Sequence, residues 1–208
     1  MAYLIGIAGG SSSGKTSFIT RLKEHFNESE LTVLSQDHYY KEIQHQIQDE
    51  HGEINFDKPE SIDEGKFLND LHALENGIDI RIKEYVFNNP KKTPQVFTLK
   101  AADVIIVEGL FIFENKHISD KLDLKLFIDA QEDFKFSRRI KRDVEERGLT
   151  EDLIEYQWNN HVKPSYEKYI LPHKDKVDMV IMNNTSFEIG ITVVSNHLKI
   201  VMSSQKSS

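Results

Sequence analysis

The 208-residue sequence contains no cysteine, which excludes disulfide bonds, thiolate metal sites and cysteine nucleophiles. It also lacks a basic surplus, because 26 lysines and arginines stand against 34 aspartates and glutamates, for a formal net charge of -8. This balance argues against binding to nucleic acid or to an anionic membrane. No apolar run approaches the ~20 residues of a membrane-spanning helix, and a strand-like run at the start is expected to leave no room for a signal peptide. We therefore expect a soluble, cytoplasmic protein.

The apolar runs that are present are short, and they alternate with longer segments of helical pattern. This alternation predicts an α/β fold with a central, mainly parallel sheet and helices on its faces. Each expected core strand is a nearly continuous apolar run, as strands buried on both faces should be: Leu4–Ala8, Leu31–Ser35, Val104–Val107, Leu124–Ile128 and Met179–Met182. Helices are expected at 14–27, 61–76, 133–147, 150–169 and 186–200.

Two of these helices begin with capping-box patterns, formed by Ser61 with Glu64 and by Thr185 with Glu188. Gly77 is expected to end the first of them.

The segment 78–99 differs from its surroundings, because two extended stretches flank the turn-rich NNPKKTP. This pattern predicts an antiparallel hairpin inserted beside the main sheet. The small polar residues of 201–208 predict a frayed tail. We expect a single domain over 1–200.

After the first expected strand the chain reads GGSSSGKTS, which fits the phosphate-binding pattern G-x-x-x-x-G-K-[ST]. Glycines let successive N–H groups face one anion, and the following helix adds its dipole. Lys15 would contact the β- and γ-phosphates, and the Thr16 hydroxyl would ligate Mg²⁺. The alternative is a plain flexible turn, but the strand before the motif and the helix after it favour ATP or GTP binding. The phosphate-binding residues are expected to be Gly9, Gly10, Ser11, Ser12, Ser13, Gly14, Lys15, Thr16 and Ser17.

The guanine-reading motif Asn-Lys-x-Asp of GTPases is missing, since the nearest stretch, NKHI, lacks the aspartate. A D-x-x-G motif is missing as well, and the chain instead reads VIIVEGLF. ATP is therefore the expected donor, with GTP as the alternative. Glu108 ends the strand in VIIVEGLF, where its carboxylate would hold Mg²⁺ directly or through water, or would pair with a neighbouring side chain.

Asp37 follows another strand, in LSQDHYY. At that position its carboxylate would face the phosphate loop and accept a proton from an attacking hydroxyl. The alternative is an aspartate that only stabilises a turn.

A basic cluster lies on the helix expected at 133–147 and at its end: Lys135, Arg138, Arg139, Arg142 and Arg147. A phosphoryl-transfer enzyme needs cations over the migrating group, and these arginines would supply them. The alternative is a solvated helix face with the i,i+4 pairs Arg139–Asp143 and Arg142–Glu146.

Taken together, these blocks resemble the uridine kinase family, within a wider group that includes phosphoribulokinases and nicotinamide riboside kinases. The resemblance covers about Tyr3 to Lys199 and rests on IGIAGGSSSGKTS, LSQDHYY, NFDKPESID, VIIVEGLF, DLKLFIDA, SRRIKRDVEERG, HVKPSYEKYILPHK and VDMVI in this order. It implies a three-layer P-loop NTPase-type fold with a helical lid at 133–157. It also implies an ATP- and Mg²⁺-dependent kinase that acts on the 5′-hydroxyl of a ribonucleoside, and that forms dimers or tetramers.

The resemblance also assigns roles by position. Asp37 matches the catalytic base near Mg²⁺, Asp57 the carboxylate that binds the ribose hydroxyls, and Tyr85 an aromatic contact to the nucleoside. The catalytic set is Asp37, Lys15, Arg139 and Arg142. Arg147 joins the phosphate-binding set at the end of the lid. The acceptor-binding set is Tyr40, Asp57, Tyr85, Phe87, Arg139 and Gln157, and the metal-binding set is Thr16, Asp37 and Glu108.

The sequence departs from the family pattern where the base would be recognised. Pro90 stands where a pyrimidine-contacting histidine is usual, and Leu149 replaces a second lid arginine. Near the adenine, IMNNTS replaces an IPRG-like segment. A different acceptor, such as nicotinamide riboside, a sugar phosphate or a pantothenate-like alcohol, is therefore an alternative. A non-catalytic ATP-binding regulatory protein is a third hypothesis, against which the retained Asp37, Glu108 and arginines argue.

Overall fold

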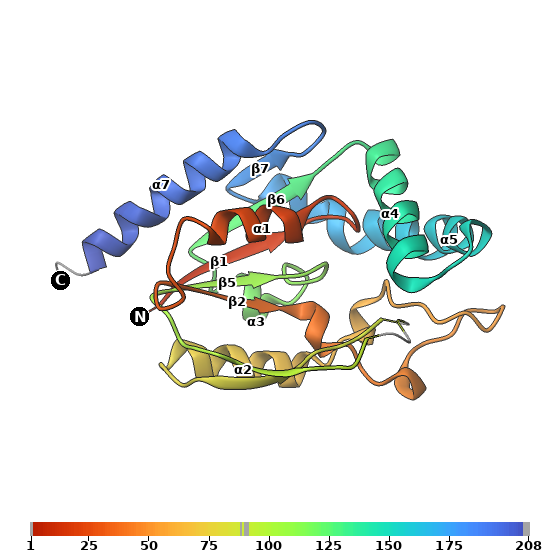
Figure 1. Cartoon of the computed structure of the whole chain (residues 1–208), viewed down its shortest axis with the longest axis horizontal. Helices are drawn as coiled ribbons and strands as arrows, with labels where there is room; N and C mark the ends of the chain where they lie inside the picture. Colours follow the sequence, from red (N-terminus) through yellow and green to blue (C-terminus); the bar gives the residue numbers. More distant parts are fainter. Residues whose placement is uncertain (1, 88, 90–91, 206–208) are drawn as a thin grey trace.

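The computed structural model describes residues 2–87, 89 and 92–205. Its centre is a five-stranded sheet in the order β2-β5-β1-β6-β7, in which every neighbouring pair is parallel (Figure 1). The strands are β1 (Tyr3–Ala8), β2 (Leu31–Ser35), β5 (Val104–Glu108), β6 (Leu124–Asp129) and β7 (Met179–Met182). The predicted α/β fold with a parallel sheet is confirmed.

Helices cover both faces of the sheet, because alternate residues of each strand point to opposite sides. Ile5 and Ile7 of β1 pack with α1 (Lys15–Lys23) and α7 (Glu188–Gln205), whereas Leu4 packs in the core that includes α2 (Glu64–Glu75). Figure 1 shows α7 and α2 at opposite sides of the sheet. The short α3 (Lys116–Ser119) lies in the same core as α2, through its buried Ile118. These three layers are those expected from the sequence.

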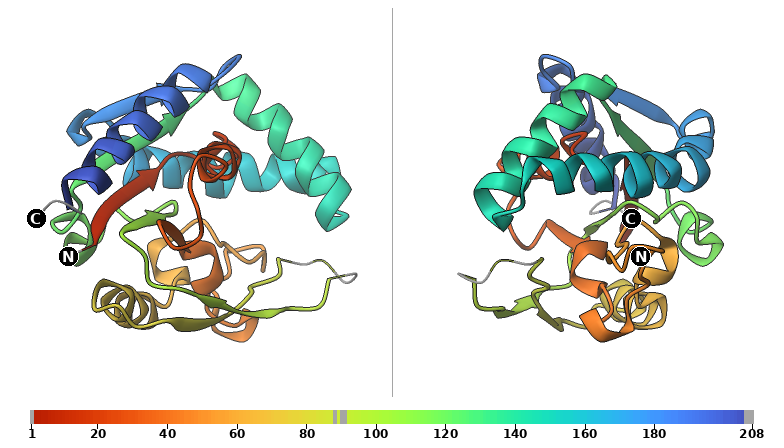
Figure 2. Two further views of the ribbon diagram at one scale, coloured as in Figure 1. Left: turned by 60° about the vertical axis from the view of Figure 1, so that its left-hand side comes forward. Right: turned by 90° about the vertical axis from the view of Figure 1, so that its right-hand side faces the viewer.

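The predicted hairpin is present as a separate antiparallel pair, β3 (Ile80–Lys83) with β4 (Val96–Leu99). Ile80 and Ile82 are buried in the core that also holds α2, so the hairpin is anchored beside the main sheet. Pro90 lies outside the described residues. In both views of Figure 2 the hairpin and α2 lie on one side of the molecule, and α4 (Glu132–Arg147) with the helices after it lies on the other.

The start of α2 differs from the expected capping box. The helix begins at Glu64, and the cap is Asp63, whose side chain accepts a hydrogen bond from the N–H of Lys66. Ser61 cannot take this role because it ends the 3₁₀ turn η3 (Pro59–Ser61) and donates its hydroxyl to the carbonyl of Asn55. The Ser61–Glu64 prediction is therefore wrong.

The end of α2 is as predicted at Gly77, which has a φ of 75°. The N–H groups of Gly77 and Ile78 donate to Leu74 and Ala73, closing a Schellman motif.

The last helix, α7, also differs from the prediction at both of its ends. The N–H of Glu188 donates to the hydroxyl of Ser186, so the predicted cap at Thr185 is wrong by one residue. The helix continues to Gln205, so residues 201–205 of the expected frayed tail are helical. In the described part of the chain, none of the helices has the length and apolar composition needed to cross a membrane.

The helix expected at 150–169 contains two widened turns. It consists of α5 (Glu151–Gln157), the π-helical η4 (Trp158–Val162), α6 (Lys163–Ser165) and the π-helical η5 (Tyr166–Ile170). The N–H of Lys163 bonds to the carbonyl of Trp158, five residues earlier. Single π-helical turns inside helices are frequent at functional sites.

Candidate active site

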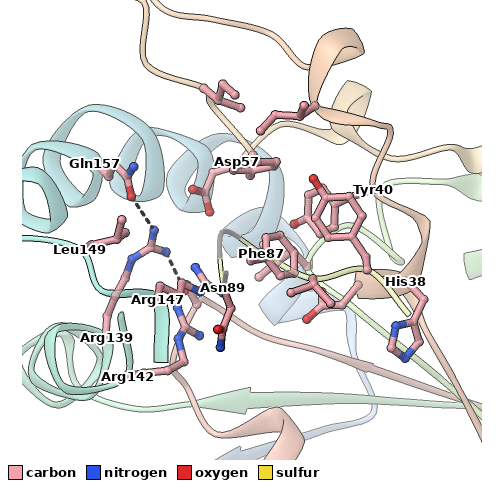
Figure 3. A pocket seen from close by; sticks show the side chains of 18 of the residues that line it. His38, Tyr40, Asp57, Phe87, Asn89, Arg139, Arg142, Arg147, Leu149 and Gln157 are labelled. Atoms are coloured by element: carbon pink, nitrogen blue, oxygen red, sulfur yellow. Dashed lines mark hydrogen bonds between the residues drawn. The ribbon is translucent and has the colours of Figure 1, made fainter. Parts of the chain in front are cut away.

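A cavity of about 1270 Å³ lies over the carboxyl ends of β1, β2 and β5. Open α/β sheets bind ligands at this edge. Figure 3 shows arginines on one side of the cavity and aromatic rings on the other, with Asp57 between them. The cavity brings together the expected sets, because its lining includes Lys15, Asp37, Asp57, Glu108 and all three of Arg139, Arg142 and Arg147.

The phosphate loop is shaped by two glycines that no larger residue could replace. A Cβ on Gly9 would lie 2.1 Å from the carbonyl oxygen of Ile128, and one on Gly14 would lie 2.1 Å from the side-chain nitrogen of Asn183. Gly14 has a φ of 101°, a conformation that side chains strongly disfavour. The Asn183 amide donates to the carbonyl of Ser13 at 2.9 Å, so the residue that follows β7 is bonded directly to the loop.

We expect Gly9→Ala to lower ATP affinity at least about tenfold, because the added methyl group meets backbone that cannot move aside. Thermal unfolding with and without MgATP measures both stability and binding. Gly65→Ala is the matched control, since its Cβ has no atom nearer than 3.7 Å and lies in the first turn of α2. A Gly9→Ala protein with unchanged MgATP affinity would contradict this reading of the loop.

Lys15 points back into the phosphate loop. Its Nζ donates to the carbonyl oxygens of Gly9 at 3.0 Å and Gly10 at 3.3 Å. Burial lowers the pKa of Lys15, and the carboxylates of Glu108 and Asp37 oppose that shift. Within the part of the chain that the structure describes, the buried Ser12 Oγ and Arg138 Nη1 have no hydrogen-bond partner. Unpaired donors beside the glycine-rich phosphate loop suit an anion with several acceptor oxygens.

Glu108 ends β5, and Asp37 lies two residues beyond the end of the adjacent strand β2. The parallel register places Ser35 beside Glu108, and the Ser35 hydroxyl donates to the Glu108 carboxylate. The same hydroxyl accepts a hydrogen bond from the N–H of Asp37 at 3.3 Å. Burial and the charge of Asp37 raise the pKa of Glu108 above its ordinary value, while Lys15 opposes the rise. A carboxylate whose pKa is raised by a second carboxylate nearby favours a cation between the two groups.

The donor set fits Mg²⁺. Over 2–87, 89 and 92–205 no group of three or more His, Cys, Asp or Glu side chains could hold a metal by itself. Asp37, Glu108 and the exposed Thr16 offer two carboxylates and one hydroxyl around the phosphate loop. Mg²⁺ takes one or two carboxylates and completes its shell with water and nucleotide phosphates, so these residues suit it.

The arginines of α4 converge on Asp143, a carboxylate that the sequence analysis named only in its alternative, the solvated helix face. Asp143 is fully buried, and it lies 3.2 Å from Arg139 Nε, 2.8 Å from Arg142 Nε and 3.4 Å from Arg147 Nη1. Burial alone would raise the pKa of Asp143, but the hydrogen bond from Arg142 and the guanidinium charges hold it below its usual value. The expected Arg139–Asp143 pair is present, whereas Arg142 pairs with Asp143 rather than Glu146.

Arg139 is the link between the phosphate loop and the acceptor side. Its Nη1 donates to the hydroxyl of Ser11 at 3.0 Å, and its Nη2 donates to Gln157 Oε1 at 3.4 Å. Only 6% of Arg139 is exposed, so its guanidinium has a fixed position. Figure 3 shows the contact between Arg139 and Gln157.

Aromatic rings form the opposite wall. Phe87 lies 4.8 Å from Tyr40 and 4.8 Å from Tyr85 between ring centroids, and Arg147 lies 4.8 Å from the Phe87 ring. Phe56, which the sequence-based reading missed, packs against Tyr40 and Phe87 as well. Burial and the carboxylates of Asp37 and Asp57 raise the pKa of Tyr40. These aromatic side chains can stack on a flat ring of a ligand, next to the carboxylates of Asp37 and Asp57.

Leu149 lines the same cavity, at the position where the family pattern has an arginine. Its N–H donates to the carbonyl of Asp143, which helps to end α4. The sequence analysis named Asp143 as an alternative partner of Arg139, but it did not predict that Asp143 also pairs with Arg142 and Arg147. Asn183 and Phe56 had no usable signal in the sequence, because their contacts join distant segments.

Known proteins with a similar sequence are kinases of one family. Residues 4–189 match the family described as PRK: Phosphoribulokinase / Uridine kinase family. The chain is 33% identical over 202 residues to uridine kinases of Staphylococcus haemolyticus (strain JCSC1435) and Staphylococcus aureus (strain JH9), covering 97% of this chain and 98% of each relative.

Two solved structures share the fold. Phosphoribulokinase from Rhodobacter spheroides has a TM-score of 0.61 at 14% identity, covering 87% of this chain and 70% of that chain. D-glycerate 3-kinase from Cryptococcus neoformans var. grubii serotype A has a TM-score of 0.60 at 15% identity, covering 88% and 86%.

Proposed function

Because the chain belongs to the phosphoribulokinase/uridine kinase family, we propose that it is an ATP- and Mg²⁺-dependent kinase that phosphorylates the 5′-hydroxyl of a ribonucleoside. Uridine and cytidine are the expected acceptors. One observation carries the proposal: a phosphate loop, the three carboxylates of Asp37, Asp57 and Glu108, three arginines and an aromatic wall line a single cavity.

The donor half is built by the loop and α4. ATP phosphates would lie on the N–H groups of Gly9 to Ser17, with Lys15 leaving its carbonyl partners to contact them. Arg139 and Arg142 would contribute charge at the transferring group, and Arg147 at the adjacent rim. Thr16, Asp37 and Glu108 would hold Mg²⁺, which when bound neutralises phosphate charge. GTP stays an alternative donor.

The acceptor half is built by Asp37, Asp57 and the aromatic wall. Asp37 is exposed at the end of β2, where it would take the proton of the attacking hydroxyl. Asp57 is 7% exposed, and its N–H donates to Asn55 Oδ1 at 2.9 Å, so the backbone at Asp57 is held in place. Its carboxylate has two oxygens and could accept a hydrogen bond from each of two ribose hydroxyls. The rings of Tyr40, Tyr85 and Phe87 would stack on the base. The cytoplasmic location and the dimeric or tetrameric assembly stay predictions.

The proposal is tested by measuring ADP release from MgATP with a panel of acceptors: uridine, cytidine, adenosine, nicotinamide riboside, pantothenate and a sugar phosphate. We expect turnover with uridine or cytidine, a nucleoside 5′-monophosphate as product, and loss of turnover when EDTA removes Mg²⁺. ATP binding without turnover on any acceptor would favour the non-catalytic alternative.

Leu149 favours one second candidate, a kinase of the same type with another acceptor. An apolar side chain at this place in the cavity cannot donate a hydrogen bond to a base, so discrimination between bases would be weak. Turnover with nicotinamide riboside, pantothenate or a sugar phosphate, but not with uridine or cytidine, would support this candidate.

A further inference from the structure

The segment 41–57 carries a carboxylate, Asp49, that no step of the proposed reaction uses. The segment follows the 3₁₀ turn η1 (Gln36–Tyr39) and forms a small hairpin through the bridge between Gln48 and Ile54. One oxygen of Asp49 accepts hydrogen bonds from the N–H groups of His51 and Glu53, both at 2.9 Å. Asp49 therefore closes the tip of this hairpin.

The second oxygen of Asp49 reaches across to the helical side of the cavity. It accepts hydrogen bonds from the Tyr156 hydroxyl at 2.7 Å and from His161 Nε2 at 2.7 Å. The hydrogen bond from Tyr156 does most to hold the pKa of Asp49 well below its usual value, and His161 and the backbone N–H groups add to it. We refer to Asp49, Tyr156 and His161 as the latch.

The helix is shaped to make the latch possible. Tyr156 lies in α5 and His161 lies five residues later in η4. In a regular α-helix residues five apart point to different faces. The π-helical turn, closed by the hydrogen bond from Lys163 to Trp158, widens the spacing and lets both side chains reach one oxygen. The side chain of His161 is only 2% exposed.

The latch connects the two parts of the acceptor site. At the base of the hairpin, the N–H of Asn55 donates to Ile47 and the N–H of Asp57 donates to the Asn55 side chain. On the helix, Gln157 follows Tyr156 directly and accepts from Arg139. Holding the hairpin against the helix therefore fixes Asp57 relative to Gln157 and Arg139.

We propose that Asp49 is a positioning residue that holds the segment 41–57, which ends in the acceptor-binding Asp57, against α5 and η4, and so sets the affinity for the acceptor rather than for ATP. This inference rests on the proposed kinase function. In Asp49→Asn one oxygen still accepts from His51 and Glu53, while the charged acceptor for Tyr156 and His161 is lost.

The test measures KM for the acceptor, KM for ATP and kcat. We expect Asp49→Asn to raise the acceptor KM about tenfold, with the ATP KM and kcat within about twofold of wild type. The matched control is Glu50→Gln, which removes one charge from the same turn at a side chain that is 87% exposed, and should leave all three constants unchanged. Tyr156→Phe should raise the acceptor KM by less, and Asp49→Asn with Tyr156→Phe should match Asp49→Asn alone.

Hydrogen exchange supplies a readout that does not depend on turnover, and we expect amides 47–55 to exchange faster in Asp49→Asn than in Glu50→Gln. An active Asp49→Asn enzyme with an unchanged acceptor KM, or with equal rises in both KM values, would overturn the latch alone. A wild-type protein that binds MgATP and transfers phosphate to no acceptor would overturn the proposed function, and the positioning role with it.

Discussion

Asp37→Asn should lower kcat by about 10²–10⁴-fold while leaving the fold intact and, at saturating Mg²⁺, the binding of ATP, since Thr16 and Glu108 remain to hold the metal. Asparagine has nearly the same shape as aspartate but cannot take a proton from the acceptor hydroxyl. The N–H of Asp37 contacts Ser35, and this backbone bond does not depend on the side chain. The loss should therefore fall on the chemical step, and a single-turnover assay with saturating acceptor and MgATP measures it directly.

Two variants separate this effect from a general loss of charge at the cavity. Glu42→Gln removes a carboxylate that lines the same cavity outside the proposed machinery, and kcat should stay within about twofold. Asp57→Asn should instead raise the acceptor KM, because its carboxylate is proposed to bind the ribose hydroxyls. An Asp37→Asn enzyme with wild-type turnover would remove the proposed base.

The parallel sheet, and the grouping of the phosphate loop with Asp37 and Glu108 at one edge of it, could be predicted because both depend on local pattern. Continuous apolar runs mark strands that are buried on both faces, and parallel strands end at a common edge. The predicted neighbours Asp37 and Glu108 are indeed joined there through Ser35. The glycines of the phosphate loop are likewise required by backbone geometry that the motif itself encodes.

The helix starts were harder to predict, because capping depends on which side chain is free to bond to the helix. Ser61 fits the capping pattern, but tertiary structure uses its hydroxyl for Asn55, and Asp63 caps α2 instead. The latch could not be predicted for a related reason. Its members lie 107 and 112 residues apart, and a π-helical turn brings two of them together.

The arginines of α4 were recognised, but their arrangement was not. Spacing along a helix shows which charges are neighbours, and it does not show whether they are exposed. The i,i+4 pair of Arg139 and Asp143 could equally have lain on a solvated face. In the folded protein both side chains of this pair are buried, and Asp143 is the common partner of three guanidinium groups.

Asp143→Asn should lower the free energy of unfolding by about 3 kcal/mol, because it leaves three guanidinium groups without their buried anion. Removing one partner of a buried ion pair costs about 3–5 kcal/mol. We expect a value at the lower end of this range because the side chains of Arg142 and Arg147 are 32% and 21% exposed and stay partly hydrated. The same change should lower kcat/KM for ATP about 10²-fold, because Arg139 and Arg142 lose the contact that fixes them. Chemical denaturation and steady-state kinetics measure the two effects.

The stability effect should depend on pH in a definite direction. The pKa of Asp143 is lower in the folded protein than in the unfolded chain, where it is about 3.9. Its stabilising contribution is therefore complete above that value and is lost as the pH falls through the folded pKa. The difference in unfolding free energy between wild type and Asp143→Asn should stay constant from about pH 7 to about pH 5 and should shrink as the pH is lowered below about 4.

Glu146→Gln is the control that decides between a buried anion and a solvated helix face. Glu146 is exposed on the same helix and has the i,i+4 spacing to Arg142 on which the solvated-face alternative rests. Because Arg142 bonds to Asp143 instead, Glu146→Gln should change stability by less than about 0.5 kcal/mol and leave turnover unchanged. Asp143→Glu keeps the charge but shifts it by one methylene, so it should recover part of the stability and less of the activity. Equal effects of Asp143→Asn and Glu146→Gln would mean that the arginines are held by the solvated face rather than by one buried carboxylate.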